Sequence, residues 1–292
     1  MNIIDSVTES CDLGVVGAGT MGIGIAQVAA QRGIECTVLE SDSAARDRAQ
    51  ARLAAALAKA HERGKLDVSV EEAQARVGWT DDITDLADAS LIIEAIPEIK
   101  DAKIALFSAL DDVCSQETIL ASNTSSIPIA ALASATNRPH QVVGLHFFNP
   151  VPAMPLVEVI PSLTTNEQTV SKADVFVRER LGKQTIRAKD QAGFVVNAIL
   201  VPYLLSAIRS LENGVASAED IDAGMVGGCA MPMGPLALCD MIGLDTMLFV
   251  ADSLHEEYQD AATVAPSLLR RHVDAGWLGR KSGRGFYDYS NR

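Results

Sequence analysis

A glycine-rich segment near the N-terminus gives the first indication of chemistry. Gly17, Gly19 and Gly22 form a G-x-G-x-x-G pattern that follows the apolar run Leu-Gly-Val-Val and leads into helical sequence. The first glycine permits a tight turn, the second lets the backbone approach a pyrophosphate, and the third lets the helix pack closely on the strand. The anion would then meet the free N–H groups at the helix N-terminus.

The residues around this pattern distinguish a dinucleotide site from an ordinary tight turn. Glu40 ends the next apolar run, about 20 residues after the third glycine, where an acid binds the hydroxyl groups of the adenosine ribose. A carboxylate there repels a 2′-phosphate, so the sequence favours NAD over NADP, although Arg46 and Arg48 leave tolerance of NADP open. Thr20 and Met21, inside the glycine pattern, belong to the same predicted cofactor site.

A second chemical feature is a carboxylate within an apolar run. Glu158 lies in the segment Leu-Val-Glu-Val-Ile, and an unpaired buried charge is costly. Glu158 therefore either has a buried partner or points to solvent from an alternating strand. His146, twelve residues earlier, has the ionisation range of a general base, but on its own it also fits a satisfied core histidine.

The scaffold for these groups shows the rhythm of βαβ units, which predicts a parallel sheet. Predicted helices span Met21–Gln31 and Ala44–Glu62. The predicted strands are short apolar runs at Leu13–Val16, Cys36–Leu39, Leu91–Ile96, Ile119–Ala121 and Val142–Leu145. After Asp190 the apolar segments lengthen and are separated by Gly and Pro, which is typical of helices. We predict a Rossmann-like, doubly wound sheet over residues 1–189 and an all-helical domain over residues 190–292.

Composition and charge exclude several classes of protein. With 292 residues, of which 48% are hydrophobic, the chain can bury two cores of ordinary size. A net charge of −14 argues against a nucleic-acid partner, because a phosphate backbone requires a positive field. A phosphate-bearing cofactor would therefore need backbone N–H groups and locally placed cations.

The cysteines and the apolar segments bear on the compartment. The five cysteines form no C-x-x-C pair, so we expect neither a disulfide framework nor a metal site. Residues 1–10 hold Asp5 and Glu9 but no basic region followed by an apolar run, so we expect no secretory signal. The uncharged stretch between Asp190 and Arg209 is interpreted as a buried helix, not a membrane span. We expect a cytoplasmic protein.

Three further segments carry a resemblance to a known family: Ser-Asn-Thr-Ser-Ser at 122–126, Leu-His-Phe-Phe-Asn-Pro-Val-Pro at 145–152, and Gly-Arg-Lys-Ser-Gly-Arg-Gly-Phe-Tyr at 279–287. With the glycine pattern and Pro-Met-Gly-Pro at 232–235, they make the chain resemble the 3-hydroxyacyl-CoA dehydrogenase family nearly end to end. The resemblance implies reversible, NAD-dependent oxidation of a short-chain (3S)-3-hydroxyacyl-CoA, such as 3-hydroxybutyryl-CoA, to a 3-oxoacyl-CoA.

The resemblance also assigns catalytic roles. His146 matches the base that takes the 3-hydroxyl proton as hydride leaves C3, and Glu158 matches the carboxylate that orients the ring. Ser125 matches a serine that contacts substrate and cofactor, although on its own it could be an N-cap for a helix opening near Ile127. Asn197 matches an asparagine that positions the acyl-CoA carbonyl, where polarisation stabilises charge that develops in the transition state.

Four more residues match positions where the family contacts the cofactor, and each also fits an ordinary surface position: Glu98, Lys103, Asn149 and Lys281. The chain departs from the commoner pattern at Ala192, where proline is usual, and at Ala198, where arginine is usual. The serine and lysine that bind CoA in the family have no clear match. Lys59 and Arg63 are the candidate CoA-phosphate ligands, and a solvated helix face is the alternative.

Two other functions remain open at this point. One is a dehydrogenase of a free hydroxy acid or sugar acid with similar His and Glu machinery, and the other is a non-catalytic NAD-binding protein. Whichever function holds, the apolar segment 195–208 and the Met-rich segment 225–247 would suit a homodimer interface in the C-terminal domain.

Overall fold

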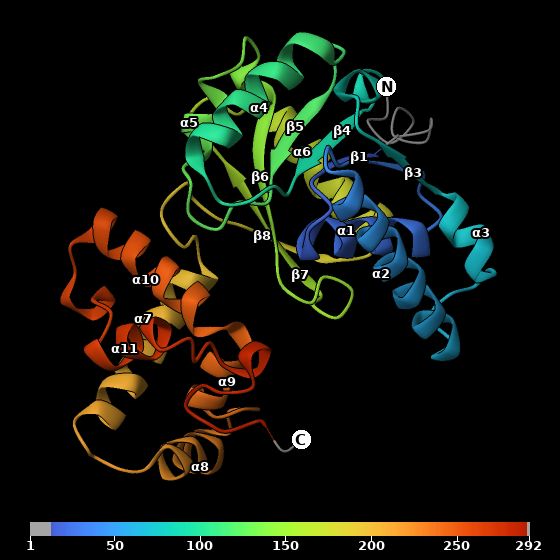
Figure 1. Cartoon of the computed structure of the whole chain (residues 1–292). Coiled ribbons are helices and arrows are strands. Elements are labelled where there is room, and N and C mark those ends of the chain that lie inside the picture. The colour runs from blue at the N-terminus through green and yellow to red at the C-terminus, as the bar shows by residue number, and fades with distance from the viewer. Residues whose placement is uncertain (1–12, 291–292) are drawn as a thin grey trace. The chain divides into compact units, whose positions relative to one another are not determined.

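The computed structural model describes residues 13–290 and divides them into two compact units, of which the first ends at Asp190 and the second begins at Gln191 (Figure 1). The expected boundary lay one residue earlier. Asp190 belongs to the first unit because its carboxylate accepts the backbone N–H groups of Ile129 and Ala130, each at 2.8 Å. Residues 1–10 and Cys11, considered above, lie outside the described residues.

The first unit is built on an eight-stranded sheet with the order β3-β2-β1-β4-β5-β6-β7-β8. The strands are β1 (Leu13–Val16), β2 (Cys36–Leu39), β3 (Val77–Thr80), β4 (Leu91–Glu94), β5 (Ile119–Ser122), β6 (Val142–Phe147), β7 (Leu156–Pro161) and β8 (Gln184–Arg187). The strands from β3 to β6 are parallel, β7 is antiparallel to β6, and β8 is parallel to β7. The predicted Rossmann-like class is confirmed, and the antiparallel β7 is the main difference from a wholly parallel sheet.

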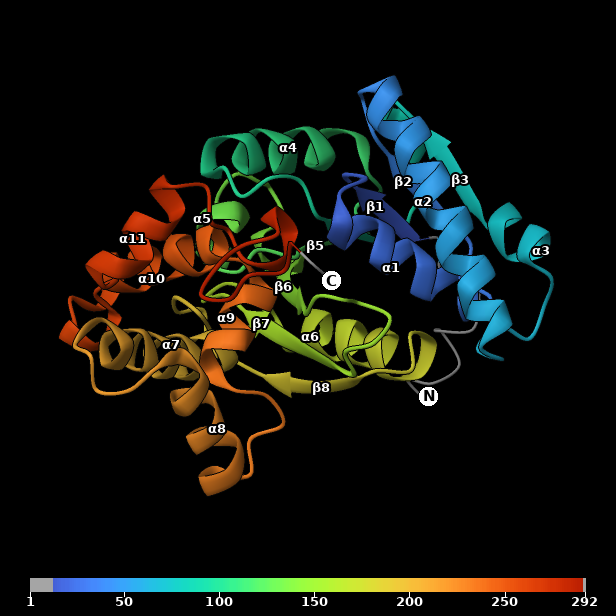
Figure 2. The same cartoon turned by 60° about the horizontal axis from the view of Figure 1, so that its bottom comes forward.

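The helices of this unit cover both faces of the sheet (Figures 1 and 2). They are α1 (Thr20–Gln31), α2 (Ser43–Glu62), α3 (Val70–Ala75), α4 (Lys100–Val113), α5 (Ile129–Ala133) and α6 (Glu167–Val175). Helices α1, α2 and α6 share one core with the alternate strand residues on one face, such as Val15, Ile93 and Leu145. Helices α4 and α5 lie on the other face (Figure 2).

The order of the strands determines where a ligand can bind. From β1 the chain adds β2 and β3 on one side and then returns to place β4 on the other side. The crossover helices α1 and α4 therefore diverge, and a crevice opens at the carboxyl ends of β1 and β4. The glycine pattern follows β1, so the sequence places it at this crevice.

The second unit is helical, as predicted. It contains α7 (Val196–Glu212), α8 (Ala218–Cys229), α9 (Pro235–Ile242), α10 (Leu244–Tyr258) and α11 (Ser267–Asp274). Its own core includes Leu205, Leu236 and Leu254. Most of the uncharged stretch belongs to α7, so the predicted helix is present, and it buries residues such as Leu204 and Ile208. The helix is only partly buried, because Ile199 is 70% exposed. Within residues 13–290, no helix is both long and apolar enough to cross a membrane.

Candidate active site

The turn between β1 and α1 shows why each glycine is needed. Gly17 has φ 98°, and a Cβ atom there would lie 2.8 Å from the carbonyl oxygen of Ala95. A Cβ on Gly22 would lie 1.9 Å from the carbonyl oxygen of Gly17, which is an impossible contact. A Cβ on Gly19 would meet no atom within 4 Å. The first and third glycines therefore serve packing, whereas Gly19 leaves open space in front of the N-terminus of α1.

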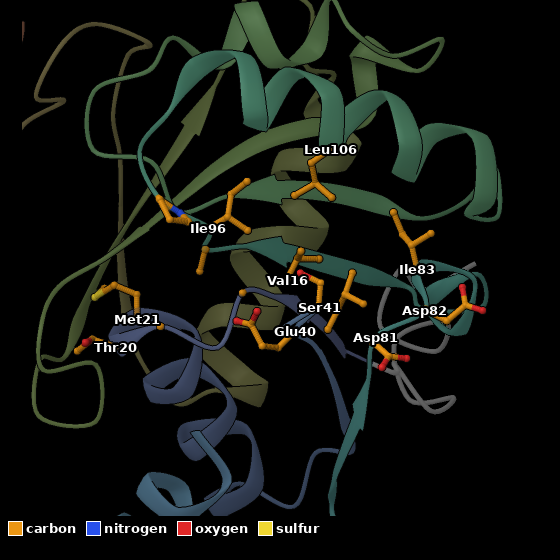
Figure 3. Close-up of a pocket in the computed structure, with 15 residues that line it drawn as sticks. Val16, Thr20, Met21, Glu40, Ser41, Asp81, Asp82, Ile83, Ile96 and Leu106 are labelled. Atoms are coloured by element: carbon orange, nitrogen blue, oxygen red, sulfur yellow. The ribbon is translucent and has the colours of Figure 1, made fainter. Parts of the chain in front are cut away.

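That open space belongs to a cavity of about 1080 Å³ at the carboxyl ends of β1, β2 and β4 (Figure 3). Its lining includes Gly17, Gly19, Thr20, Met21 and Glu40. This volume lies slightly above the range of about 300–1,000 Å³ that is usual for small-molecule and cofactor sites, so it can hold an extended cofactor. The predicted cofactor residues of the turn and of the end of β2 thus lie around one cavity.

Glu40 is held at this cavity by backbone N–H groups. Its Oε2 accepts from Ala18 N at 3.1 Å, and its Oε1 accepts from Asp42 N at 3.2 Å. The carboxylate therefore stands beside the glycine turn, where Figure 3 shows it at the cavity wall. An anion-binding helix N-terminus with an acid at the end of the next strand fits a dinucleotide without a 2′-phosphate.

Two substitutions in the turn separate cofactor approach from packing. Gly19→Ala is expected to leave the free energy of unfolding within about 1 kcal/mol of wild type, because Gly19 has an ordinary φ of −68° and open space at Cβ. It is expected to weaken NADH binding at least about tenfold, because the added methyl group occupies the path of the pyrophosphate. Titration of NADH fluorescence and denaturant unfolding measure the two effects.

The matched variant Gly22→Ala is expected to affect the free energy of unfolding more than Gly19→Ala does. Its methyl group overlaps the Gly17 carbonyl, so the variant should lose about 1–3 kcal/mol of stability through overpacking. Equal stability losses in both variants would contradict this division of roles.

The pair of His146 and Glu158 results from strand register. In the antiparallel β6–β7 ladder His146 lies directly opposite Glu158, so both side chains project from the same face of the sheet. Nδ1 of His146 lies 2.7 Å from Oε2 of Glu158, and the side chains are 6% and 0% exposed. The partner expected for a buried Glu158 is thus His146, and Glu158 does not point to solvent.

The other ring nitrogen of His146 faces the loop after β5. His146 Nε2 lies 3.3 Å from Ser125 Oγ. Ser125 is not a helix N-cap, because α5 begins at Ile129 with Pro128 at its N-cap position. The side chain of Asn123 joins this loop to β6, because its Oδ1 accepts from Phe147 N at 2.9 Å.

A group of three charges, of which Lys103 and Glu94 are buried and Glu98 is partly buried, fixes the same loop. Lys103 is 1% exposed, and its Nζ lies 2.7 Å from Glu94 Oε1 and 2.9 Å from Glu98 Oε2. Glu98 Oε1 in turn accepts the backbone N–H groups of Ser125 and Ser126 at 2.9 and 3.2 Å. The sequence predicted Glu98 and Lys103 as cofactor contacts, and the structure places both in a network that positions Ser125.

The protonation of this network follows from its contacts. Burial raises the pKa of Glu94, and the charge of Lys103 opposes that rise without cancelling it. Burial also acts to raise the pKa of Glu98, but Lys103 and the hydrogen bond from Thr124 outweigh it, so that pKa lies below its usual range. Sequence reasoning missed Glu94, although a glutamate that ends the strand run Leu-Ile-Ile-Glu resembles Glu158 in being a charge beside apolar neighbours.

The remaining predicted residues are less clearly placed at the cavity. Asn149 is exposed just after β6, and Lys59 and Arg63 are exposed near the C-terminal end of α2. Asn197 lies in the first turn of α7, in the second unit. Lys281, also in that unit, forms an ion pair with Asp245 at 2.6 Å. The functional roles of all five stay predictions.

Contacts within the second unit account for one departure from the family pattern and for one segment that matches it. The departure is Ala192, which donates its backbone N–H to Glu257 Oε2 at 3.1 Å, a bond that a proline at this position could not make. In the glycine-rich tail, Asp240 accepts the N–H groups of Phe286 and Tyr287 at 2.9 Å each. A Cβ on Gly285 would lie 2.0 Å from Asp240 Oδ1, so this glycine serves packing of the tail.

Comparisons with known proteins identify the family of the chain. Residues 12–191 match the family described as 3-hydroxyacyl-CoA dehydrogenase, NAD binding domain, and residues 193–289 match the 3-hydroxyacyl-CoA dehydrogenase C-terminal domain. A 3-hydroxybutyryl-CoA dehydrogenase of Mycobacterium tuberculosis is 48% identical over 279 residues, which cover 95% of this chain and 98% of that protein.

Solved structures give the same result. The crystal structure of FadB2 from M. tuberculosis has a TM-score of 0.92 and 48% identity, covering 95% of this chain and 98% of that chain. The structure of (S)-3-hydroxybutyryl-CoA dehydrogenase from Ralstonia eutropha has a TM-score of 0.91 and 43% identity, covering 97% of this chain and 100% of that chain. The predicted family and the predicted cofactor NAD are confirmed. The chain belongs to the 3-hydroxyacyl-CoA dehydrogenase family and is an NAD-dependent oxidoreductase.

Proposed function

We propose that this protein catalyses the reversible oxidation of short-chain (3S)-3-hydroxyacyl-CoA, such as 3-hydroxybutyryl-CoA, to 3-oxoacyl-CoA. The observation that supports this most directly is the buried contact of His146 Nδ1 with Glu158, which leaves Nε2 on the side of Ser125. Relatives from M. tuberculosis and R. eutropha that are named 3-hydroxybutyryl-CoA dehydrogenases are 48% and 43% identical to this chain, which supports the same substrate class.

In the proposed reaction each side chain acts at a stated atom. Bound NAD supplies the hydride acceptor. His146 Nε2 takes the proton of the 3-hydroxyl group, while Glu158 holds the Nδ1 proton and stabilises the imidazolium that forms. Ser125 Oγ orients the hydroxyl group toward Nε2, and Asn197 polarises the acyl-CoA carbonyl. The same imidazolium returns its proton in the reverse direction, which makes the step reversible.

The experiment that tests this proposal is an assay of NADH formation by the purified protein with NAD⁺ and 3-hydroxybutyryl-CoA. We expect activity with the thioester, none with free 3-hydroxybutyrate, and much less with NADP⁺. Activity with the free acid alone would refute the CoA assignment in favour of a free-acid dehydrogenase. NADH binding without turnover of any hydroxyacyl substrate would indicate a non-catalytic NAD-binding protein.

The second unit is proposed to form a homodimer. Its helices expose large apolar side chains, with exposed fractions of 70% for Ile199, 43% for Val226, 48% for Met241 and 47% for Phe249. Exposed large apolar side chains of this kind are available for contact with a second chain. A solution mass near that of one 30.9 kDa chain would contradict the dimer.

Two further proposals concern the substrate and the compartment. We propose that the CoA phosphates are bound by Lys59 and Arg63, and that the protein is cytoplasmic.

A further inference from the structure

An ion pair lies next to the adenosine end of the cofactor cavity and has no part in the proposed chemistry. Arg46 Nη1, on the first turns of α2, lies 3.0 Å from Asp81 Oδ2, which follows β3. The same Nη1 donates to the carbonyl oxygen of Glu40 at 3.4 Å. Asp81 and Glu40 both line the cavity, and Figure 3 shows both carboxylates there.

The position of Arg46 matters for the choice between NAD and NADP. The two cofactors differ only in a phosphate on the 2′-oxygen of the adenosine ribose, the group that the acid at the end of β2 faces. An NADP-binding site supplies an arginine near that acid, because a guanidinium pairs well with phosphate oxygens. Arg46 touches the backbone of Glu40 and is therefore a cation within reach of such a phosphate.

The neighbouring arginines of α2 are placed differently. Arg48 is exposed, and Arg52 donates its Nη2 to the carbonyl oxygen of Ala18 at 2.7 Å, beside the glycine turn. Arg46 has a side chain only 21% exposed, whereas that of Asp81 is 63% exposed. A pair with so exposed a member contributes little to stability, so stability does not account for its presence.

We propose that Asp81 is a cofactor-specificity residue, which selects NAD by holding Arg46 in an ion pair and so withholding it from a 2′-phosphate. Specificity of this kind comes from a penalty on the wrong ligand, not from a new contact with the right one. Binding of NADP would have to break the pair of Arg46 with Asp81, whereas binding of NAD leaves it intact. Glu40 adds a second carboxylate on the same side.

The test compares direct binding of NADH and NADPH, by fluorescence titration, in wild type and five variants. Asp81→Ala is expected to tighten NADPH binding about three- to fivefold, the range that an exposed ion pair can supply, and to change NADH binding less than about twofold. Arg46→Ala alone is expected to leave NADPH binding as weak as in wild type, because Arg46 is already occupied. In the double variant Asp81→Ala/Arg46→Ala, most of the gain should disappear, because the gain requires the released arginine.

The remaining variants separate this effect from a general change in charge. Asp82→Asn removes the same charge at the next residue, whose carboxylate accepts the N–H of Thr84 instead of pairing with Arg46. Arg48→Ala removes an exposed cation from the same helix. Three results would each overturn the proposal. They are a gain in NADPH affinity that persists in the double variant, an equal gain in NADPH affinity from Asp82→Asn, and no gain from Asp81→Ala. Because the readout is cofactor binding, these results are independent of the acyl substrate.

Discussion

His146→Gln is expected to lower kcat with 3-hydroxybutyryl-CoA by about 10³-fold, the range that general acid–base catalysis supplies, while NADH binds within about twofold of wild type. The imidazole acts on the substrate hydroxyl group, and the cofactor cavity is lined by other residues. Glutamine is the informative replacement because its amide N–H can still donate to Glu158. The variant therefore does not leave a buried carboxylate unpaired.

Steady-state kinetics, NADH titration and thermal unfolding together check this prediction. Glu158→Gln is the matched variant, because it keeps a hydrogen-bonding group opposite His146 and removes only the charge. We expect a smaller loss of kcat from Glu158→Gln, since the base remains but its imidazolium is less stabilised. If His146→Gln instead abolishes NADH binding or lowers the melting temperature sharply, then His146 has a structural role.

The parts of the site that local sequence encodes could be predicted. The glycine turn has its strand, turn and helix within one short segment, and the structure shows steric reasons for Gly17 and Gly22. The buried partner of Glu158 could also be anticipated, because a charge among apolar neighbours requires one. The identity of that partner depended on the register of β6 against β7, and only the family resemblance suggested it before the structure.

The parts that sequence alone did not reveal depend on contacts between distant segments. The strands β3 and β8 lie at the two edges of the sheet, and their half-exposed residues form no continuous apolar run. The pair of Arg46 and Asp81 forms only because β3 places Asp81 beside the start of α2. The pairing of Lys103 was missed for a different reason: its partner Glu94 is only nine residues away, but the sequence does not show that both side chains are buried and paired.

Lys103→Met is expected to lower the free energy of unfolding by about 3–5 kcal/mol at neutral pH, the cost of removing one member of a buried ion pair. Glu94 is fully buried, and without Lys103 its charge and that of Glu98 are left to repel each other. The loop of Ser125 should also lose its position, because Glu98 accepts the Ser125 N–H. Urea unfolding, together with kcat for 3-hydroxybutyryl-CoA, measures both effects.

The pH dependence of this variant gives a sharper test. Burial already raises the pKa of Glu94, and loss of the Lys103 charge should raise that pKa further. A carboxyl group whose pKa is raised in the folded state binds its proton more tightly in the folded than in the unfolded protein. Its contribution to the free energy of unfolding is therefore most favourable at low pH and is lost as the pH rises through the folded-state pKa. The deficit in stability should therefore be largest at neutral pH and shrink as the pH falls.

Lys100→Met is the matched control for Lys103→Met, because Lys100 begins the same helix and is exposed, so its loss should change stability by less than about 0.5 kcal/mol. The two interpretations of Lys103 predict different results. A residue that only contacts the cofactor would lose NADH binding when replaced and keep its unfolding free energy. A residue of the buried network would lose stability even without cofactor, and Glu94→Gln in the same chain should restore part of it, because the substitution removes the unpaired charge.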